Sequence, residues 1–293
     1  MKKIFYLLTL LSFWLVSCQE VNDLIQLYPP PGVNDQLVLD STYTTNNTSI
    51  QQKRVLIEDY TGDMCDNCPN AQTQSINIEN ANPGLISVIG IHCTSLAAPW
   101  PGYPDYRTAN GTQLMSYFFG IGGPSSLPTG DIDRKIQTIT SPPSFSVPYS
   151  IWPFCVDSEL ILTPKAGIAF SYKNYDSSSR TLNMTFTTSF NKASTDTFYV
   201  SAAVIESGFK GKQELPTSYN NNFVFEHVLR KLMSPYNGLK IASSPALGAT
   251  YNVKFQTVLD PSWNADSCKV VAFVHHRSPG NNTVEQVQET TVK

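Results

Sequence analysis

Apolar residues in the first half of the chain alternate between strand-like and helix-like spacing. Three runs are typical of buried strands: 53–60, 85–93 and 127–134. Between the first two, Pro69 suits the first turn of a helix, so "NAQTQSINIEN" predicts a helix that ends at 82–84. "TANGTQLMSYFFG" predicts a second helix ending at Gly120. Strands that alternate with helices predict an α/β domain in which part of the sheet is parallel.

After about residue 140 the pattern changes, and the proline-rich stretch "SPPSFSVPYSIWP" marks a boundary. Turn clusters such as "NYDSSSR" and "HRSPGNN" then separate short runs of β-forming residues. Seven such runs lie near 166–173, 181–190, 197–206, 223–232, 250–258, 268–276 and 283–292. This spacing predicts an all-β immunoglobulin-like sandwich, interrupted by an irregular excursion over 207–249.

The N-terminal segment is typical of an export signal. Lys2 and Lys3 precede an apolar run from Ile4 to Val16, which is too short to span a bilayer as a mature helix. The sequence Leu-Val-Ser-Cys at 15–18 resembles a bacterial lipobox, in which the cysteine is lipidated and becomes the first residue of the mature protein. The alternative is an ordinary signal peptide with an incidental cysteine.

These patterns divide the chain into four parts. We expect a lipoprotein signal peptide over 1–17, a tether over 18–50, a thioredoxin-like domain over 51–158 and a β-sandwich domain over 159–293. The tether is polar and turn-rich, with an edge strand near 36–39. A lipid on Cys18 would anchor the protein to a membrane without a spanning helix.

Composition excludes nucleic acid as a partner. The net charge is −3, only 15% of residues are charged and no block of five like charges occurs, so nothing attracts a polyanion. Apolar residues make up 41% of the chain, which is enough to form cores. We expect no cofactor and no metal, and a partner that is an unidentified envelope or extracellular protein.

The candidate chemistry lies in "DMCDNCPN", residues 63–70, where two cysteines are three positions apart at the predicted start of a helix. Partial positive charge at a helix N-terminus stabilises a thiolate and lowers its pKa. We therefore assign Cys65 as nucleophile and Cys68 as the resolving thiol of a thiol–disulfide exchange. This order of strand, C-x-x-C and helix is thioredoxin-like, and proteins of that type carry a buried acid at the spacing of Asp59, which shuttles a proton. They also carry a cis-proline beside the cysteines, so we expect the Leu127-Pro128 bond to be cis.

Other interpretations of the cysteines remain open. A zinc site from Cys65, Cys68, His92 and Cys93 is disfavoured because adjacent strand residues point to opposite faces of a sheet. A purely structural Cys65–Cys68 bridge in a binding protein is a serious alternative. Cys93 either pairs with Cys155 or is buried, whereas Cys268 is expected to be a buried thiol. We expect His275 and His276 to be exposed at a strand end.

Four segments together resemble one family: "RVLIEDYTGDMCDNCP", "YRTANGTQLMSYFFGIGGPSSLPTGDIDR", "FEHVLRKLM" and "CKVVAFV", in this order behind a lipobox. The chain resembles the Omp28-related outer-membrane lipoproteins of Gram-negative bacteria over most of residues 50–293. The resemblance implies a thioredoxin-like domain, a C-terminal β-sandwich and an outer-membrane or surface location. It implies no particular reaction. The leading hypothesis is thus an anchored protein with thiol–disulfide exchange, and the alternative is a non-enzymatic surface binding or adhesion protein.

Overall fold

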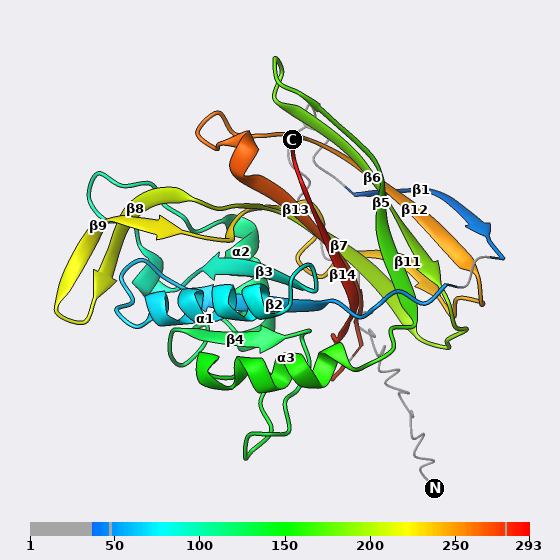
Figure 1. The fold of residues 1–293 in the computed structure, drawn as a ribbon, viewed down its shortest axis with the longest axis horizontal. Coiled ribbons are helices and arrows are strands. Elements are labelled where there is room, and N and C mark those ends of the chain that lie inside the picture. The colour runs from blue at the N-terminus through cyan, green and yellow to red at the C-terminus, as the bar shows by residue number, and fades with distance from the viewer. Residues whose placement is uncertain (1–36, 47–48, 279) are drawn as a thin grey trace, which may run out of the picture.

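The computed structural model describes residues 37–46, 49–278 and 280–293, and an eight-stranded mixed sheet dominates it (Figure 1). Its strands in chain order are β2 (Val55–Thr61), β3 (Ile86–His92), β4 (Thr129–Ile132), β7 (Thr197–Glu206), β10 (Val228–Leu232), β11 (Leu239–Ser243), β13 (Cys268–His276) and β14 (Val284–Thr291). Across the sheet the order is β14-β13-β7-β10-β3-β2-β4, and β11 pairs with β7.

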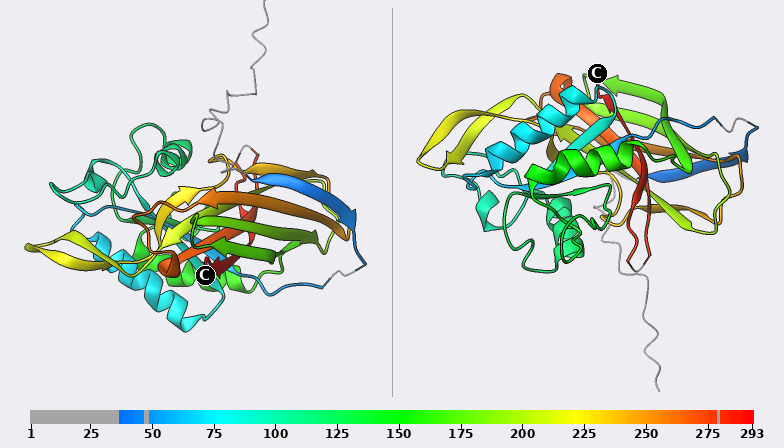
Figure 2. Two further views of the ribbon diagram at one scale, coloured as in Figure 1. Left: turned by 90° about the horizontal axis from the view of Figure 1, so that it is seen from above. Right: turned by 60° about the horizontal axis from the view of Figure 1, so that its bottom comes forward.

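A four-stranded antiparallel sheet and a separate hairpin complete the β-structure. The four-stranded sheet has the order β1-β12-β6-β5 and is formed by β1 (Val38–Thr44), β5 (Ala166–Asp176), β6 (Thr181–Phe190) and β12 (Ala249–Val258). Strands β8 (Phe209–Leu215) and β9 (Ser218–Phe225) form the hairpin. This hairpin and the β1–β12 edge lie at opposite ends of the molecule (Figures 1 and 2).

Three α-helices occur in the described part of the chain: α1 (Cys68–Ala81), α2 (Ala109–Phe119) and α3 (Trp152–Leu160). Successive side chains of β2 point to opposite faces of the sheet. Val55 and Ile57 pack in a cluster with α1 and α3, whereas Leu56 and Tyr60 pack in a cluster with α2. None of the helices in the described residues is long and apolar enough to cross a membrane.

The predicted fold class, an α/β thioredoxin-like domain followed by an all-β immunoglobulin-like sandwich, is wrong. The described chain is mostly β-structure, and the strands β2, β3 and β4 belong to the same sheet as β7, β13 and β14 from the second half. The individual elements 53–60, 85–93 and 127–134 were expected correctly. Pairing between distant strands cannot be deduced from local periodicity, so the merging of two sets of strands into one sheet was missed.

The sheet is joined at a single narrow point between β3 and β10. Val228 pairs with Gly90 in parallel orientation, and the Gly90 N–H donates to the His227 carbonyl over 2.8 Å. A Cβ at position 90 would lie 3.3 Å from that same carbonyl oxygen, so the close approach favours glycine. On its other edge β10 pairs antiparallel with β7, which carries the sheet on to β13.

Buried charges cross-link the sheet beside this joint. The Arg134 guanidinium makes two hydrogen bonds to the Glu58 carboxylate, of 2.6 and 2.7 Å, with both side chains almost fully buried. Burial, with Glu58 nearby, raises the pKa of Asp131 well above its usual range. Lys53 forms a second buried ion pair with Asp133 at 2.7 Å. The segment "GDIDR" therefore supplies charges to the core as well as a strand.

Strands β8 and β11 and helix α3 were not predicted, and the single run expected near 223–232 forms the end of β9 and the whole of β10. The proline-rich stretch that suggested a domain boundary contains the start of α3, because Pro153 occupies the first turn of that helix. Trp152 is fully buried and packs directly on Gly130, where a Cβ would lie 2.4 Å from the indole ring. The predicted domain borders at 50/51 and 158/159 remain predictions.

Replacing Arg134 by alanine should destabilise the fold strongly. The change leaves Glu58 buried beside Asp131 without its cation, and breaking a buried pair costs about 3–5 kcal/mol. Arg107→Ala is the matched control, because the Arg107–Asp105 pair is more than one-third exposed and such pairs contribute about 0–1 kcal/mol. Urea unfolding measures both variants. Equal losses of unfolding free energy would contradict the role given to Arg134.

Candidate functional site

The two cysteines of "DMCDNCPN" form a disulfide at the start of α1. Cys68 is the first residue of the helix and Cys65 precedes it in a tight turn, in which the Cys68 N–H donates to the Cys65 carbonyl. Gly62 begins the loop and packs against Leu96, whose carbonyl oxygen would lie 2.4 Å from a Cβ at position 62. Both cysteines are buried, with exposed fractions of 4% for Cys65 and 1% for Cys68.

The β8–β9 hairpin covers this disulfide. The Gln213 side-chain amide donates to the Cys65 carbonyl over 2.9 Å and to the Gly62 carbonyl over 3.3 Å. The Glu214 backbone N–H donates to the Asp63 carbonyl over 2.8 Å. Strand β8 therefore lies along the cysteine loop and makes the kind of backbone contact that an extended peptide would make there.

Side chains from helix α1 hold the base of the hairpin. The Gln72 amide donates to the Val224 carbonyl over 2.9 Å and accepts from the Glu226 N–H over 3.1 Å. His227, just after β9, lies 3.0 Å from the Glu79 carboxylate. These contacts fix the base of the hairpin to the helix that begins at the disulfide.

Aromatic contacts hold the outer part of the hairpin. The Lys212 ammonium lies 4.0 Å from the Trp100 ring centre and 4.1 Å from that of Tyr219. Such cation–π contacts contribute about 0.5–1 kcal/mol each at exposed sites. The Trp100 indole N–H also donates to the Asp63 carbonyl over 3.2 Å, which ties the same loop to the hairpin.

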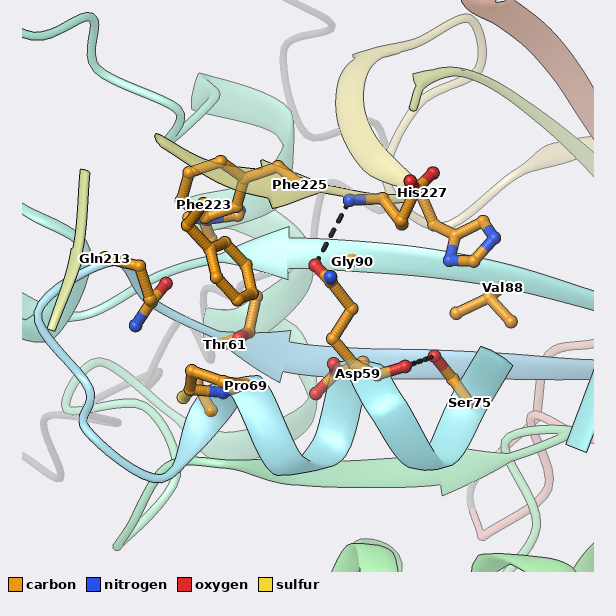
Figure 3. Close-up of a pocket in the computed structure, with 14 residues that line it drawn as sticks. Asp59, Thr61, Pro69, Ser75, Val88, Gly90, Gln213, Phe223, Phe225 and His227 are labelled. Carbon is orange, nitrogen blue, oxygen red and sulfur yellow. Dashed lines mark hydrogen bonds between the residues drawn. The ribbon is translucent and has the colours of Figure 1, made fainter. Parts of the chain in front are cut away.

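A small cavity of about 20 Å³ lies behind the disulfide (Figure 3). Asp59 lines it from β2, Pro69 and Ser75 line it from the helix side, and Phe223 and Gln213 line it from the hairpin (Figure 3). Cys68 belongs to the same lining. The structure thus places the predicted acid and the predicted resolving cysteine at one cavity.

Asp59 is an uncompensated buried acid. It is 4% exposed, and its Oδ1 has no hydrogen-bond partner among the described residues. Burial raises the pKa of Asp59 to about 8, so the carboxyl group holds its proton at neutral pH. A protonated acid at this position can give a proton to a thiolate that forms at Cys68.

His92 is a further member of the cavity lining that the sequence did not single out for this chemistry. It is 4% exposed, and neither ring nitrogen has a partner within the described residues. Its ring packs between Tyr106 and Phe225 at centroid distances of 5.4 and 5.6 Å. Burial is the main cause that lowers the pKa of His92 to about 3, and the positive charge of Arg230 adds to it.

Pro128 lies just before β4, the strand that pairs with β2. The Leu127-Pro128 bond is cis, as expected, and Pro128 directly precedes β4, whose Thr129 pairs with Tyr60 of β2. The end of β2 leads into the loop that carries Cys65. Cys18, the predicted lipidation site, lies outside the described residues.

The other three cysteines of the described residues are free, buried thiols on different parts of the fold. Cys93 packs in the cluster with α2, whereas Cys155 packs in the cluster with α1 and α3, so the pairing left open between them is not formed. Cys268 is buried as expected. Burial raises the pKa of Cys93 to about 12, which makes it a poor nucleophile.

The expectation of exposed histidines at 275 and 276 is wrong. Their exposed fractions are 2% and 5%. His275 is hydrogen-bonded to the Ser201 hydroxyl at 3.0 Å, and His276 lies 3.2 Å from the Glu285 carboxylate. The two rings are buried because β7 and β14 pair with β13 on its two sides.

The residues that close the site, Gln72 and Gln213, carry no sequence signal. A glutamine in a strand or a helix is usually solvated, and both acquire their role only when the hairpin folds back onto α1. Asp59 was found because its spacing from Cys65 is short and local. The indication for His92 was weaker. Side chains alternate along a strand, so His92 faces the cavity and Cys93 faces away from it.

Comparisons with known proteins agree with this architecture. The family described as outer membrane protein Omp28 matches residues 115–293, more than half of the chain. Among solved structures, HBP35 of Porphyromonas gingivalis is similar with a TM-score of 0.63 and 17% identity, covering 82% of this chain and 76% of that chain. Protein AGR_C_4864 from Agrobacterium tumefaciens is similar with a TM-score of 0.50 and 8% identity, covering 84% and 97%. At these identities the two structures show the fold alone. No curated protein sequence matches the chain.

Ionisation of Asp59 should make the folded protein less stable as the pH rises from about 4 to about 8. An unfolded aspartate loses its proton near pH 4, whereas folded Asp59 keeps it up to about pH 8. The folded state therefore binds one more proton in this window, and the free energy of unfolding falls with rising pH. Asp59→Asn should flatten that slope in urea unfolding measured across the window.

Asp63→Asn is the matched control for this measurement. Burial raises the pKa of Asp63 only to about 6, so its removal should flatten the slope between about pH 4 and 6 and leave the range above it unchanged. A slope between pH 6 and 8 that is the same in Asp59→Asn and in the wild type would show that Asp59 titrates normally.

Proposed function

We propose a function for this chain from its family: it belongs to the outer membrane protein Omp28 family, and we infer that a lipid on Cys18 anchors it to the outer membrane. We further propose that its Cys65–Cys68 pair exchanges disulfides with an envelope or extracellular protein. Residues 37–293 would then work outside the reducing cytosol, where a disulfide persists.

The observation that carries the exchange proposal is the buried, unpartnered carboxyl group of Asp59 at the cavity that Cys68 lines. Leaving a buried polar group unpaired costs about 1–3 kcal/mol, so it is a poor structural device. Groups with strongly shifted pKa values cluster at functional sites. Here the raised pKa keeps a proton available beside a potential leaving thiolate.

In the proposed reaction a thiolate of the partner attacks the Cys65 sulfur, and the Cys65–Cys68 bond breaks. Cys68 leaves with the electron pair and takes a proton from Asp59. A second thiolate of the partner then attacks the partner's own sulfur in the mixed disulfide and releases Cys65 as a thiolate, which is protonated by solvent. The partner is oxidised by two electrons and the pair is reduced by two. Pro128 would support the partner's chain next to the loop.

The structure is the closed state in this proposal. With Cys65 only 4% exposed, an attacking sulfur reaches it after the β8–β9 hairpin has moved away from the loop. The contacts to be broken are the Gln213 hydrogen bonds and the Glu214–Asp63 backbone bond. A partner strand could replace them one for one, which would offset the cost of opening.

The same burial favours a second candidate function. If the hairpin never opens, the disulfide is a structural staple at the start of α1, and the protein is a non-enzymatic surface binding or adhesion protein. In that case the second half of the chain carries the binding surface. The two candidates differ in whether the folded protein can be reduced.

Dithiothreitol should reduce the disulfide in the folded protein, and Gln213→Ala should accelerate this reaction about tenfold. Removing the amide takes away two hydrogen bonds to the Cys65 and Gly62 carbonyls, each worth about 0.5–1.5 kcal/mol, which raises the open population by one to two orders of magnitude. Mass-spectrometric counting of alkylated cysteines over time measures the rate. Asn221→Ala, at an exposed position of the same hairpin, is the control and should react like the wild type.

The staple function predicts a different result in the same assay. Reduction would then proceed at the rate of global unfolding in all three proteins and would require urea. That outcome would exclude exchange and leave the binding function.

Cys18→Ser should release the protein from the membrane. Without the thiol no lipid can be attached, so labelled palmitate should not be incorporated and the chain should fractionate as a water-soluble protein. Ser17→Ala, which keeps the thiol, is the control and should stay in the membrane fraction. Unchanged membrane association of Cys18→Ser would rule out a lipid anchor at this residue.

A further inference from the structure

The cavity behind the disulfide has the size and the lining of a site for one water molecule. Its volume is about 20 Å³, and a buried water needs about 10–15 Å³ on the same measure. The site is lined by residues of α1, β2, β3 and the β8–β9 hairpin. Buried polar groups that lack a protein partner are commonly satisfied by such waters.

Most polar groups of the lining are already engaged. Both ends of the Gln72 amide bind the base of the hairpin, the Ser75 hydroxyl donates to the Gln72 carbonyl, and the Gln213 amide binds the cysteine loop. Two lining side chains have buried polar atoms without a partner within the described residues: Asp59, at Oδ1, and His92, at both ring nitrogens. Each of these side chains is 96% buried, because each residue is 4% exposed.

We infer that one water molecule occupies this cavity between the Asp59 carboxyl and the His92 imidazole, and that His92 is a positioning residue for the exchange at Cys65–Cys68. The role in exchange rests on the proposed function, whereas the water site does not. A neutral imidazole has one N–H donor and one acceptor, so it can hold a water in a fixed orientation.

The water would act at the moment when Asp59 gives its proton to the Cys68 thiolate. The proton transfer leaves a carboxylate in a buried site, where an unsolvated charge is costly. The bound water, held by His92, donates an O–H to Asp59 Oδ1 and stabilises that charge. His92 keeps its own protons throughout, and Asp59 recovers its proton from solvent while the hairpin is open.

The charges around Asp59 and His92 are compatible with a neutral His92 ring. The positive charge of Arg230, itself paired with Glu206 at 2.8 Å, disfavours protonation of the ring, whereas Asp105 on the neighbouring loop favours it. The remaining titratable groups that line the cavity or act on the two residues are Cys93, Tyr106, Glu226 and His227. His227 is directed to Glu79, and Tyr106 packs edge-on against the His92 ring.

Two variants of His92 separate its hydrogen bonding from its packing. His92→Phe keeps an aromatic ring between Tyr106 and Phe225 but cannot hold the water, and His92→Gln can hold a water but does not titrate. Loss of a donor to the carboxylate raises its pKa. The titration midpoint of Asp59, followed by carbon NMR in the oxidised protein, should therefore rise by about one pH unit in His92→Phe and stay near the wild-type value in His92→Gln.

The same variants should change the dithiothreitol reaction. At pH 7 reduction should be about tenfold slower in His92→Phe, a factor that corresponds to one pH unit, and near wild-type in His92→Gln. In the wild type, the pH profile of the reduction rate should turn downwards above about pH 8, where Asp59 loses its proton. In His92→Phe the same downturn should occur at a higher pH. A merely structural role for His92 would leave both the midpoint and the downturn unchanged.

A crystal structure of the wild type at high resolution tests the water directly. Density within hydrogen-bond distance of both Asp59 Oδ1 and a His92 nitrogen is expected, and an empty cavity would overturn the inference, as would equal Asp59 midpoints in all three proteins. If His92→Phe does not fold, the crystal structure of the wild type alone tests the water site. If dithiothreitol reduces none of the folded proteins, the exchange function and the role of His92 in it fail together, whereas the midpoints and the density still judge the water site.

Discussion

The bond between Gly90 and His227 is the constraint on which the arrangement around the cysteine pair depends. It joins the strand pair β2–β3 to β10, and through β10 to β7 and β13. Strand β9 of the hairpin ends at Phe225, two residues before His227, so the residue that closes the sheet also fixes where the hairpin lies. The pairing of Gly90 with Val228 therefore keeps the sheet continuous and also positions the hairpin that covers the disulfide.

The charged cluster around Arg134 has a different role from the acid at the cavity. Glu58 and Arg134 satisfy one another in the core, and Lys53 satisfies Asp133. Asp59 lies on the opposite face of β2 from Glu58 and has no such cation. The pleat of β2 thus places the two neighbouring acids on opposite faces. Glu58 is neutralised by Arg134, whereas Asp59 is protonated and has no cation. A buried acid of the second kind is expected where a proton is transferred.

Local patterns predicted much of the secondary structure but not its assembly. The strands at 53–60 and 85–93, the helix after Pro69 and most of the later β-strands follow from apolar spacing and turn residues, which act over a few positions. The cysteine pair and Asp59 were found for the same reason. The single sheet, α3, the hairpin strand β8 and the closing contacts of Gln213 depend on pairing across 150 residues, for which one sequence holds no periodic signal. The buried state of His275 was missed because its neighbours come from β7 and β14.

The distribution of thiols has a consequence for maturation. Five cysteines follow Cys18, and one bridge forms among them. Cys65 and Cys68 lie so close in sequence that they can meet before the sheet assembles, whereas Cys93, Cys155 and Cys268 end up in three separate apolar clusters. Once the layers have come together, a wrong bridge to any of these three would require the interior to come apart. The order in which the chain assembles can thus protect the correct linkage.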